Sequence, residues 1–203
     1  MEIAFRLEET DHHIAILTFD QPGSKVNTLS DPVLKELARR VGELQDRRDL
    51  RGLLLRSGKP GQFIAGADLK ELSSLVRITK KEIASFVARA HELFDQVSQL
   101  PWPTVALIDG PCLGGATELV LAMDYRVASN SPRTRIGLPE VTLGIIPSWG
   151  GTQRLVRLID VSEAIEMICS GGPVAPAKAV TLGLVSDAVT ADRLVDEGCR
   201  LIE

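Results

Sequence analysis

Two neighbouring stretches of the chain decide its fold, and each brings a glutamate close to a pair of glycines. Residues 108–126 read IDGPCLGGATELVLAMDYR, with Glu118 just after its glycine pair. Residues 137–155 read GLPEVTLGIIPSWGGTQRL, with Glu140 ahead of its glycine pair. Two carboxylates that flank glycine turns indicate a site where protons or an anion could be handled, and the rest of the chain is interpreted around them.

The first stretch has the order of a strand, a tight turn and a helix. The apolar residues 104–108 predict a buried strand, Gly114 and Gly115 predict the turn, and residues 117–123 predict a helix that carries Glu118. Backbone N–H groups at a helix N-terminus favour negative charge, so the turn could hold an oxyanion. A purely structural role fits equally well, since paired glycines often form only a turn and an early glutamate often only complements the helix dipole.

The composition argues against several classes of protein. With 203 residues, of which 44% are hydrophobic and 25% charged, the chain is large enough for one domain with a substantial core. Its net charge of −4 and its aromatic content of 4% argue against a nucleic-acid-binding surface. No apolar run approaches the roughly 20 residues that cross a bilayer, and the N-terminus lacks the plan of a signal peptide. We therefore expect a cytoplasmic protein with neither a membrane nor a nucleic-acid partner.

Cysteine and histidine are too scattered to predict a metal site. The chain has three of each, and they do not share the spacing of zinc ligands. The odd number of cysteines predicts reduced, mostly buried thiols. The residues concerned are Cys112, Cys169 and Cys199, together with His12, His13 and His91. We expect no metal ion.

Predicted strands and helices alternate along the chain. Ser30 is expected to cap a helix that has Pro32 in its first turn. The other predicted helices span 80–100, 117–123, 152–158, 162–169, 175–182 and 192–203. The predicted strands are a hairpin within 1–20, followed by 50–56, 105–108, 125–128 and 184–189. This alternation predicts an α/β fold with largely parallel strands, in one domain that covers residues 1–203.

Three ordered blocks of sequence carry a resemblance to a known family. They are FIAGADLKE at 63–71, LGGATEL at 113–119 and LPEVTLGIIPSWGGTQRL at 138–155. With these blocks the chain resembles the crotonase, or enoyl-CoA hydratase/isomerase, superfamily over nearly its whole length. The resemblance implies a crotonase-like spiral of ββα units, which usually assembles as trimers or dimers of trimers. It also implies that helices expected on the C-terminal side are missing, so that residues 1–203 form a truncated core.

The resemblance assigns roles to individual residues. Ala67 and Gly115 would supply the two backbone N–H groups of an oxyanion hole for the thioester oxygen of an acyl-CoA substrate. Glu118 and Glu140 match the two acid/base glutamates of the hydratases. The backbone N–H of Ser148 would hold the catalytic water; relatives often have glycine at this position, but serine keeps the N–H. Adding water to an unsaturated thioester needs these parts, since charge develops on the thioester oxygen while protons move on and off.

The coenzyme A portion of the substrate needs its own groove. By resemblance, Lys25 and Val26 lie beside the nucleotide, and backbone groups of Ala65, Asp68 and Leu69 face the adenine. Lys25 could equally be a solvated loop lysine. No cofactor is expected, because coenzyme A is part of the substrate.

Two further features refine the expected function. Trp149 is bulky enough to narrow the acyl pocket. The wording VLAMDYRVA at 120–128 resembles the hydratase domain of multifunctional fatty-acid oxidation proteins, in which a 3-hydroxyacyl-CoA dehydrogenase follows on the same chain. A homo-oligomer or a fused or associated dehydrogenase domain is therefore expected.

The reaction expected from both glutamates is hydration of trans-2-enoyl-CoA to 3-hydroxyacyl-CoA in β-oxidation. An enoyl-CoA isomerase remains an alternative, because one glutamate can move a proton between two carbons. A non-catalytic fragment that only binds coenzyme A is another. An RNA-binding or scaffold role is disfavoured by the net charge and by the intact glutamates.

Overall fold

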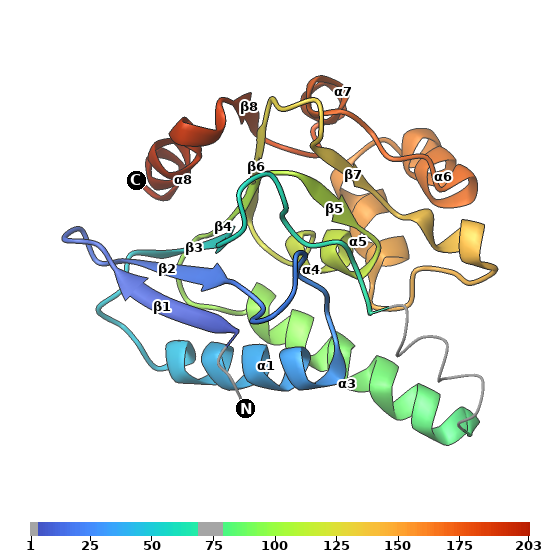
Figure 1. Ribbon diagram of the computed structural model, residues 1–203, viewed down its shortest axis with the longest axis horizontal. Helices are drawn as coiled ribbons and strands as arrows, with labels where there is room; N and C mark the ends of the chain where they lie inside the picture. The colour runs from blue at the N-terminus through green and yellow to red at the C-terminus, as the bar shows by residue number, and fades with distance from the viewer. Residues whose placement is uncertain (1–3, 69–78) are drawn as a thin grey trace.

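The computed structural model describes residues 4–68 and 79–203, and its central feature is a six-stranded sheet (Figure 1). The strands are β1 (Phe5–Glu9), β2 (Ile14–Phe19), β3 (Gly52–Ser57), β4 (Thr104–Ile108), β5 (Pro111–Leu113), β6 (Tyr125–Ser129), β7 (Arg135–Gly137) and β8 (Asp187–Val189). The α-helices are α1 (Asp31–Gln45), α3 (Lys80–Ser98), α4 (Gly115–Val120), α5 (Gly151–Leu158), α6 (Val161–Ser170), α7 (Pro176–Thr181) and α8 (Leu194–Ile202). Two short 3-10 helices are η2 (Pro139–Leu143) and η3 (Ala191–Arg193).

The large sheet has the strand order β1-β2-β3-β4-β6-β8. Strands β1 and β2 form an antiparallel hairpin, and every other pairing in this sheet is parallel. All residues of β2 and β4 are buried, which is why both strands are almost entirely apolar, with one threonine each, rather than alternating. The predicted α/β fold with largely parallel strands is confirmed.

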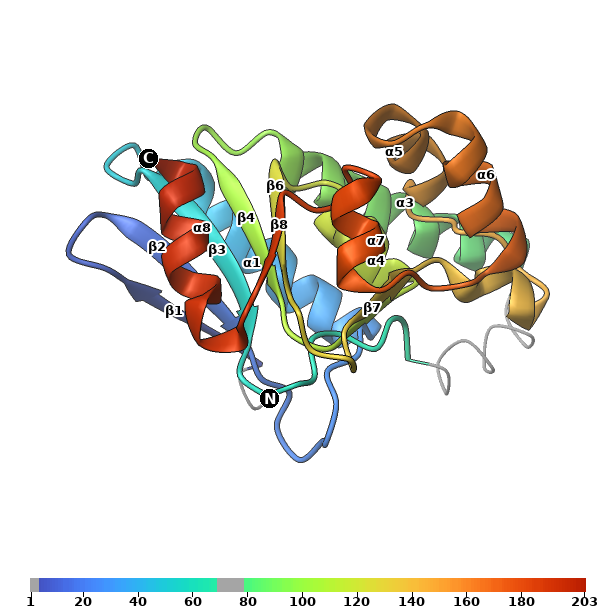
Figure 2. The ribbon, with the colours of Figure 1, turned by 90° about the horizontal axis from the view of Figure 1, so that it is seen from above.

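Helices cover both faces of this sheet. Figures 1 and 2 show α1 and α3 on one face and α8 lying across the other. Helix α8 fits closely because it carries Gly198: a Cβ there would lie 2.8 Å from Leu107 Cδ2 and 2.9 Å from Leu54 Cδ2. The apolar residues under α8 form a small core of their own, separate from the main core on the other face.

Successive strands and helices form two similar units, β4-β5-α4 and β6-β7-η2. The short strands β5 and β7 leave the large sheet and pair with each other in parallel. This pairing brings the residues that follow each short strand, Gly114 and Leu138, to the same end of the small sheet. The two glutamate-bearing stretches of the sequence therefore meet in space.

Some local predictions need correction. Ser30 occupies the N-cap position of α1, but its side chain makes no capping hydrogen bond. Helix α4 begins at Gly115, two residues before the predicted start, and β5 and β7 were not predicted, because three-residue strands leave too little pattern to detect. The prediction that the cysteines are mostly buried is confirmed for Cys112 and wrong for Cys169, whose side chain is exposed.

Among the described residues, none of the helices combines the length and the apolar character that a membrane span requires.

Candidate active site

The glycine turn between β5 and α4 has a backbone that only glycine adopts readily. Gly114 has φ 57° and ψ −127°, and its N–H donates to the carbonyl oxygen of Gly137 at 2.9 Å. Helix α4 starts at the next residue, Gly115, which is buried. The N–H of Gly115 thus lies at a helix start, where no carbonyl of the helix itself can accept from it.

A second segment runs beside this turn. Ile64 and Cys112 form a parallel bridge, so the segment that leads to Ala67 runs in the same direction as the strand that leads to Gly115. The approach is close, because a Cβ on Gly66, whose φ is +101°, would lie 2.8 Å from the carbonyl oxygen of Leu113. The predicted partners of the oxyanion hole are therefore carried by adjacent segments.

Neither of these two N–H groups has an acceptor within the described part of the chain. The backbone bonds around Ala67 are made by its neighbours: Leu29 donates to the carbonyl of Gly66, and Asp68 donates to the carbonyl of Leu29. At the other segment, Gly114 and Glu118 donate, but Gly115 does not. Two backbone N–H groups without acceptors, on adjacent segments, could both donate to one oxyanion.

Glu118 is held in place by the loop before α5. Its Oε1 accepts from the backbone N–H of Trp149 at 2.7 Å and from that of Gly151 at 2.8 Å. The side chain is buried in the first turn of α4, one turn from the open N–H of Gly115. Both bonds use one oxygen of the carboxylate, so within the described part of the chain the other oxygen has no hydrogen-bond donor and could meet a reacting partner.

Glu140 approaches the same turn from η2. Glu140 is 8% exposed, and its Oε2 is buried with no hydrogen-bond partner among the described residues. Its Oε1 lies 3.0 Å from where a Cβ of Gly114 would stand, so the carboxylate faces the turn that precedes α4. A buried carboxyl oxygen with no partner is costly unless it carries a proton or meets a water or a ligand.

The electrostatics of the two glutamates fit proton transfer near neutral pH. The pKa of Glu118 is raised to about 7, mainly by burial and to a smaller extent by the nearby charge of Glu140, against the lowering effect of its two backbone donors and of Arg154. Burial also raises the pKa of Glu140. Raised pKa values in two neighbouring carboxyls allow one to be protonated while the other is ionised, which is the condition for paired acid and base roles.

Comparison with known proteins identifies the family of the chain. The family model for enoyl-CoA hydratase/isomerase matches residues 9–203. The chain belongs to the enoyl-CoA hydratase/isomerase family.

Relatives of known name are similar across almost the whole chain. It is 42% identical over 193 residues to the fatty acid oxidation complex subunit alpha of Vibrio campbellii, and 43% identical over 189 residues to that of Shewanella halifaxensis. These matches cover 95% and 93% of this chain but only 27% and 26% of the relatives. The chain thus spans about a quarter of the length of these relatives.

Solved structures of the family superpose closely. The enoyl-CoA hydratase of Bacillus anthracis gives a TM-score of 0.89 at 33% identity, covering 98% of this chain and 75% of that one. An enoyl-CoA hydratase of Geobacillus kaustophilus gives 0.90 at 27% identity, covering 99% and 74%. The predicted crotonase-like fold is confirmed by these neighbours.

Within this family fold, the predicted coenzyme A residues lie on two joined segments. Lys25 is exposed and Val26 half-buried in the loop after β2. That loop is tied to the second segment, because the N–H of Ala65 donates to the carbonyl of Asn27 at 2.9 Å. Asp68 follows on that segment, and the predicted residue Leu69 lies outside the described residues. Since the N–H of Ala65 is engaged, its carbonyl is the group that could face an adenine.

The sequence did not predict which groups fix Glu118. Ser148 is exposed, and its N–H has no acceptor among the described residues, so it could hold a water as expected. The N–H groups of Trp149 and Gly151, by contrast, bind Glu118. Arg154 braces that loop: its Nη1 donates to the Trp149 carbonyl at 3.0 Å. The glycine pair at 150–151 was the available signal, since such a loop exposes consecutive N–H groups.

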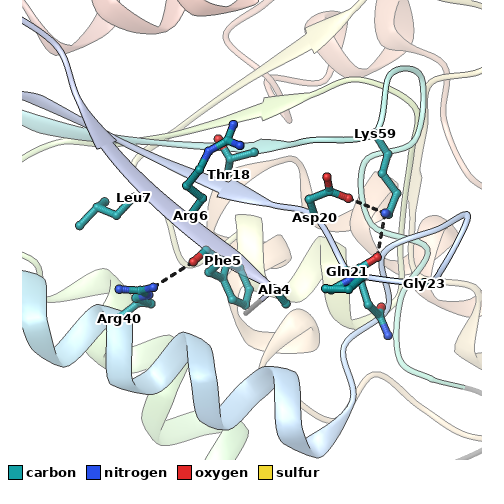
Figure 3. A pocket seen from close by; sticks show the side chains of 11 residues that line it. Ala4, Phe5, Arg6, Leu7, Thr18, Asp20, Gln21, Gly23, Arg40 and Lys59 are labelled. Atoms are coloured by element: carbon teal, nitrogen blue, oxygen red, sulfur yellow. Dashed lines mark hydrogen bonds and ion pairs between the residues drawn. The ribbon is translucent and has the colours of Figure 1, made fainter. Parts of the chain in front are cut away.

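A separate hollow of about 690 Å³ opens between β1 and the loop after β2 (Figure 3). None of the four oxyanion-hole and glutamate residues lines it. Its cations are already paired, since Lys59 Nζ lies 2.5 Å from Asp20 Oδ1, and Arg40 Nη2 donates to the carbonyl of Phe5 at 3.1 Å. It is thus a surface depression apart from the candidate active site.

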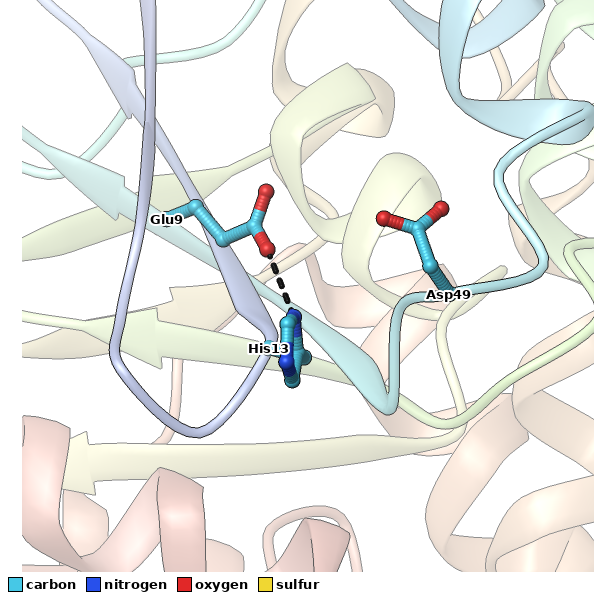
Figure 4. A group of neighbouring side chains, drawn as sticks. All are labelled: Glu9, His13 and Asp49. Carbon is cyan, nitrogen blue, oxygen red and sulfur yellow. Dashed lines mark hydrogen bonds and ion pairs between the residues drawn. The ribbon is translucent and has the colours of Figure 1, made fainter.

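Glu9, His13 and Asp49 gather at the hairpin end of β1 (Figure 4). His13 Nδ1 lies 3.0 Å from Glu9 Oε1. The guanidinium of Arg47 bonds both carboxylates, at 2.8 Å to Glu9 Oε2 and 2.6 Å to Asp49 Oδ2. The exposed acidic groups are therefore neutralised by an arginine, as in a surface ion-pair network.

Proposed function

We propose that the chain is an enoyl-CoA hydratase, which adds water across the double bond of trans-2-enoyl-CoA to give 3-hydroxyacyl-CoA. The observation that carries this proposal is the meeting of two buried glutamates with raised pKa values at a turn whose backbone N–H is open. Family membership supports it, since enoyl-CoA hydratases are among the proteins of similar fold.

The thioester oxygen would lie between the N–H groups of Ala67 and Gly115. Attack of water at Cβ of the substrate moves electrons through the double bond onto this oxygen, giving an enolate. Two fixed donors stabilise that charge where it develops, without reorganising at the moment of reaction. The close approach of the two segments at Gly66 and Leu113 supports this role, because these residues directly precede Ala67 and the glycine turn before α4.

The two glutamates would move the protons. One carboxylate removes a proton from the attacking water, and the other carboxyl group delivers a proton to Cα as the enolate collapses. Glu118, with a pKa of about 7, is able to exchange a proton at neutral pH. The unpartnered Oε2 of Glu140 is a position where a water or a substrate atom would satisfy a buried oxygen. Ser148 would help to hold the water by its backbone N–H.

The coenzyme A portion would follow the segments that contain Lys25, Val26, Ala65 and Asp68, with Leu69 next in the sequence. The bond from Ala65 to Asn27 supports a continuous binding edge, because it joins the two segments. No metal ion or other cofactor is needed for this reaction, because the protein supplies both the electrophilic donors and the proton carriers.

The names of the relatives support a place in fatty-acid oxidation. The similar subunits of Vibrio campbellii and Shewanella halifaxensis are named for the fatty acid oxidation complex, and each is about four times longer than the matched part. A 3-hydroxyacyl-CoA dehydrogenase, fused or associated, would consume the product. Assembly as a trimer-type homo-oligomer remains part of this proposal.

Hydration of crotonyl-CoA tests the proposal through loss of the enoyl absorbance. Glu118→Gln and Glu140→Gln should each lower kcat/KM by at least roughly 10²-fold, with little change in the affinity for a saturated acyl-CoA. Glu166→Gln, on the exposed side of α6, is the matched control and should leave the rate unchanged. Near-normal hydration in either active-site variant would sink the assignment.

A parallel assay with a trans-3-enoyl-CoA separates hydratase from isomerase. Formation of conjugated enoyl absorbance, without hydration of crotonyl-CoA, would identify an isomerase instead, because that reaction needs only one proton carrier. Binding of a saturated acyl-CoA with no reaction of either substrate would identify a non-catalytic domain that binds coenzyme A.

A further inference from the structure

The indole ring of Trp149 lies directly against the start of α4. A Cβ added to Gly115 would be 2.3 Å from Cζ3 and 2.5 Å from Cε3 of this ring. Since a Cβ lies about 1.5 Å from its Cα, Cζ3 is within about 4 Å of the Gly115 Cα. The ring is therefore next to the residue that is proposed to hold the thioester oxygen.

The same ring is fixed from α3 by two aromatic neighbours. Phe86 meets it edge to face with centroids 5.6 Å apart, and Phe94 does so at 6.0 Å. Trp149 is 3% exposed, and Phe94 is completely buried behind it. Edge-to-face contacts of this kind favour one ring orientation, so the indole is a rigid surface and not a mobile side chain.

The backbone of Trp149 is fixed as well. Its N–H donates to Glu118 Oε1 at 2.7 Å, and its carbonyl accepts from Arg154 Nη1 at 3.0 Å. Arg154 is in turn paired with Asp95 of α3, at 2.6 Å. One residue thus contacts the proposed base or acid through its backbone and the proposed oxyanion donor through its ring. A shift of the Trp149 backbone would disturb Glu118, and a shift of the ring alone is resisted by Phe86 and Phe94.

We propose that Trp149, backed by Phe86 and Phe94, is the end wall of the acyl pocket and restricts the substrate to short enoyl chains. This inference rests on the proposed function. An acyl group whose thioester oxygen lies within about 3 Å of the Gly115 N–H starts beside the indole. A four-carbon acyl chain extends only one carbon beyond its double bond and would not reach past the indole. A long acyl chain would have to displace the indole, which packs against Phe86 and Phe94.

The test compares two substrates in variants of the 203-residue chain. The ratio of kcat/KM for trans-2-butenoyl-CoA to that for trans-2-dodecenoyl-CoA should fall at least roughly 10-fold in Trp149→Ala, since pocket size discriminates acyl chains by such factors. Trp149→Phe keeps an aromatic ring and should fold even if the alanine variant does not; it should shift the ratio by less. Trp102→Phe is the matched control, because that buried indole bonds the Arg47 carbonyl elsewhere and should leave the ratio unchanged.

A binding measurement gives a result that does not depend on catalysis. The chain has two tryptophans, so Trp102→Phe leaves Trp149 as the only tryptophan, whose emission can be excited selectively over that of Tyr125. Butanoyl-CoA should change its emission, whereas free coenzyme A should not, because only the acyl part reaches the ring. This outcome without any hydration would keep the inference and overturn the proposed reaction. The inference alone would be overturned if the chain hydrates crotonyl-CoA but also gives two results. These are an unchanged ratio of kcat/KM for the two enoyl-CoA substrates in both Trp149 variants, and equal emission changes with butanoyl-CoA and with free coenzyme A.

Discussion

Replacing Gly115 with alanine should destabilise the protein, because the Trp149 ring already fills the space that the methyl group needs. The methyl carbon would lie 2.3 Å from Cζ3 and 2.5 Å from Cε3 of the ring. Nonbonded carbons prefer a separation of about 3.5–4.0 Å, so the ring would have to shift by more than about 1 Å. Phe86 and Phe94 pack against the ring and resist that shift.

The expected cost follows from overpacking in a rigid core. Inserting a methyl group into a well-packed site costs about 1–3 kcal/mol in the free energy of unfolding. For a chain of about 200 residues, each 1 kcal/mol lowers Tm by about 2–4 °C, so Gly115→Ala should lower Tm by about 2–12 °C. Urea titration at constant pH and thermal unfolding followed by circular dichroism would measure both quantities.

Gly42→Ala is the matched control for the same chemical change. Gly42 lies inside α1 on the exposed side, and a Cβ there would meet no atom within 4 Å. Since alanine has the higher helix propensity, this variant should gain about 0.5–1 kcal/mol. The two glycines should therefore respond with opposite signs.

A double-mutant cycle isolates the contact itself. In a Trp149→Leu background, the cost of Gly115→Ala should fall to below about 0.5 kcal/mol, because the clashing ring is gone. An equal cost in both backgrounds would refute the steric reasoning, and so would a Gly115→Ala variant as stable as Gly42→Ala.

Three further predictions concern charge and reactivity. The pKa of Glu118 is raised from 4.5 to about 7, mainly by burial. Between pH 4.5 and 7 the folded state therefore binds more protons than the unfolded state, so the free energy of unfolding should fall as pH rises through this range. Glu118→Gln should remove this fall, so its free energy of unfolding in urea titrations should rise relative to wild type by up to about 3 kcal/mol between about pH 4.5 and 8. A difference between the two proteins that does not change with pH would contradict this prediction. Arg154 lowers the pKa of Glu118, so Arg154→Met should move the corresponding limb of the kcat/KM profile to higher pH, with a smaller move for Arg154→Lys; unmoved limbs in both would contradict the assignment. A thiol reagent should label exposed Cys169 quickly but Cys112 only after unfolding, because burial raises the pKa of Cys112 to about 12; native labelling of Cys112, read by peptide mass, would refute its burial.

Much of the fold could be predicted because its main elements carry strong local patterns. Strands β2 and β4 are almost entirely apolar, and α3 has an apolar face that packs on the core, so the type and approximate bounds of these elements follow from the sequence. Strands β5 and β7 could not be predicted, because three residues are too short for a period and the pairing joins segments far apart in sequence. Nor could the sequence show that Ser30 makes no capping hydrogen bond, because such a bond depends on a side-chain rotamer that no pattern specifies.

The candidate site shows the same division. Glu118, Glu140 and the glycine turn were identified because their motifs are ordered and long. The N–H groups of Trp149 and Gly151 were not recognised as partners of Glu118, since that contact depends on how the loop before α5 folds back over α4. The packing of Phe86 and Phe94 against Trp149 could not be predicted either, because Phe86 has the sequence pattern of an ordinary core position of a helix.

A structure with a bound saturated acyl-CoA tests the central claim most directly. The account predicts that the thioester oxygen lies within about 3 Å of the backbone nitrogens of both Ala67 and Gly115. It further predicts that carboxylate oxygens of Glu118 and Glu140 face the Cα and Cβ atoms of the acyl group. An acyl-CoA bound with its thioester oxygen away from both nitrogens, or with either glutamate turned from the acyl carbons, would contradict the account.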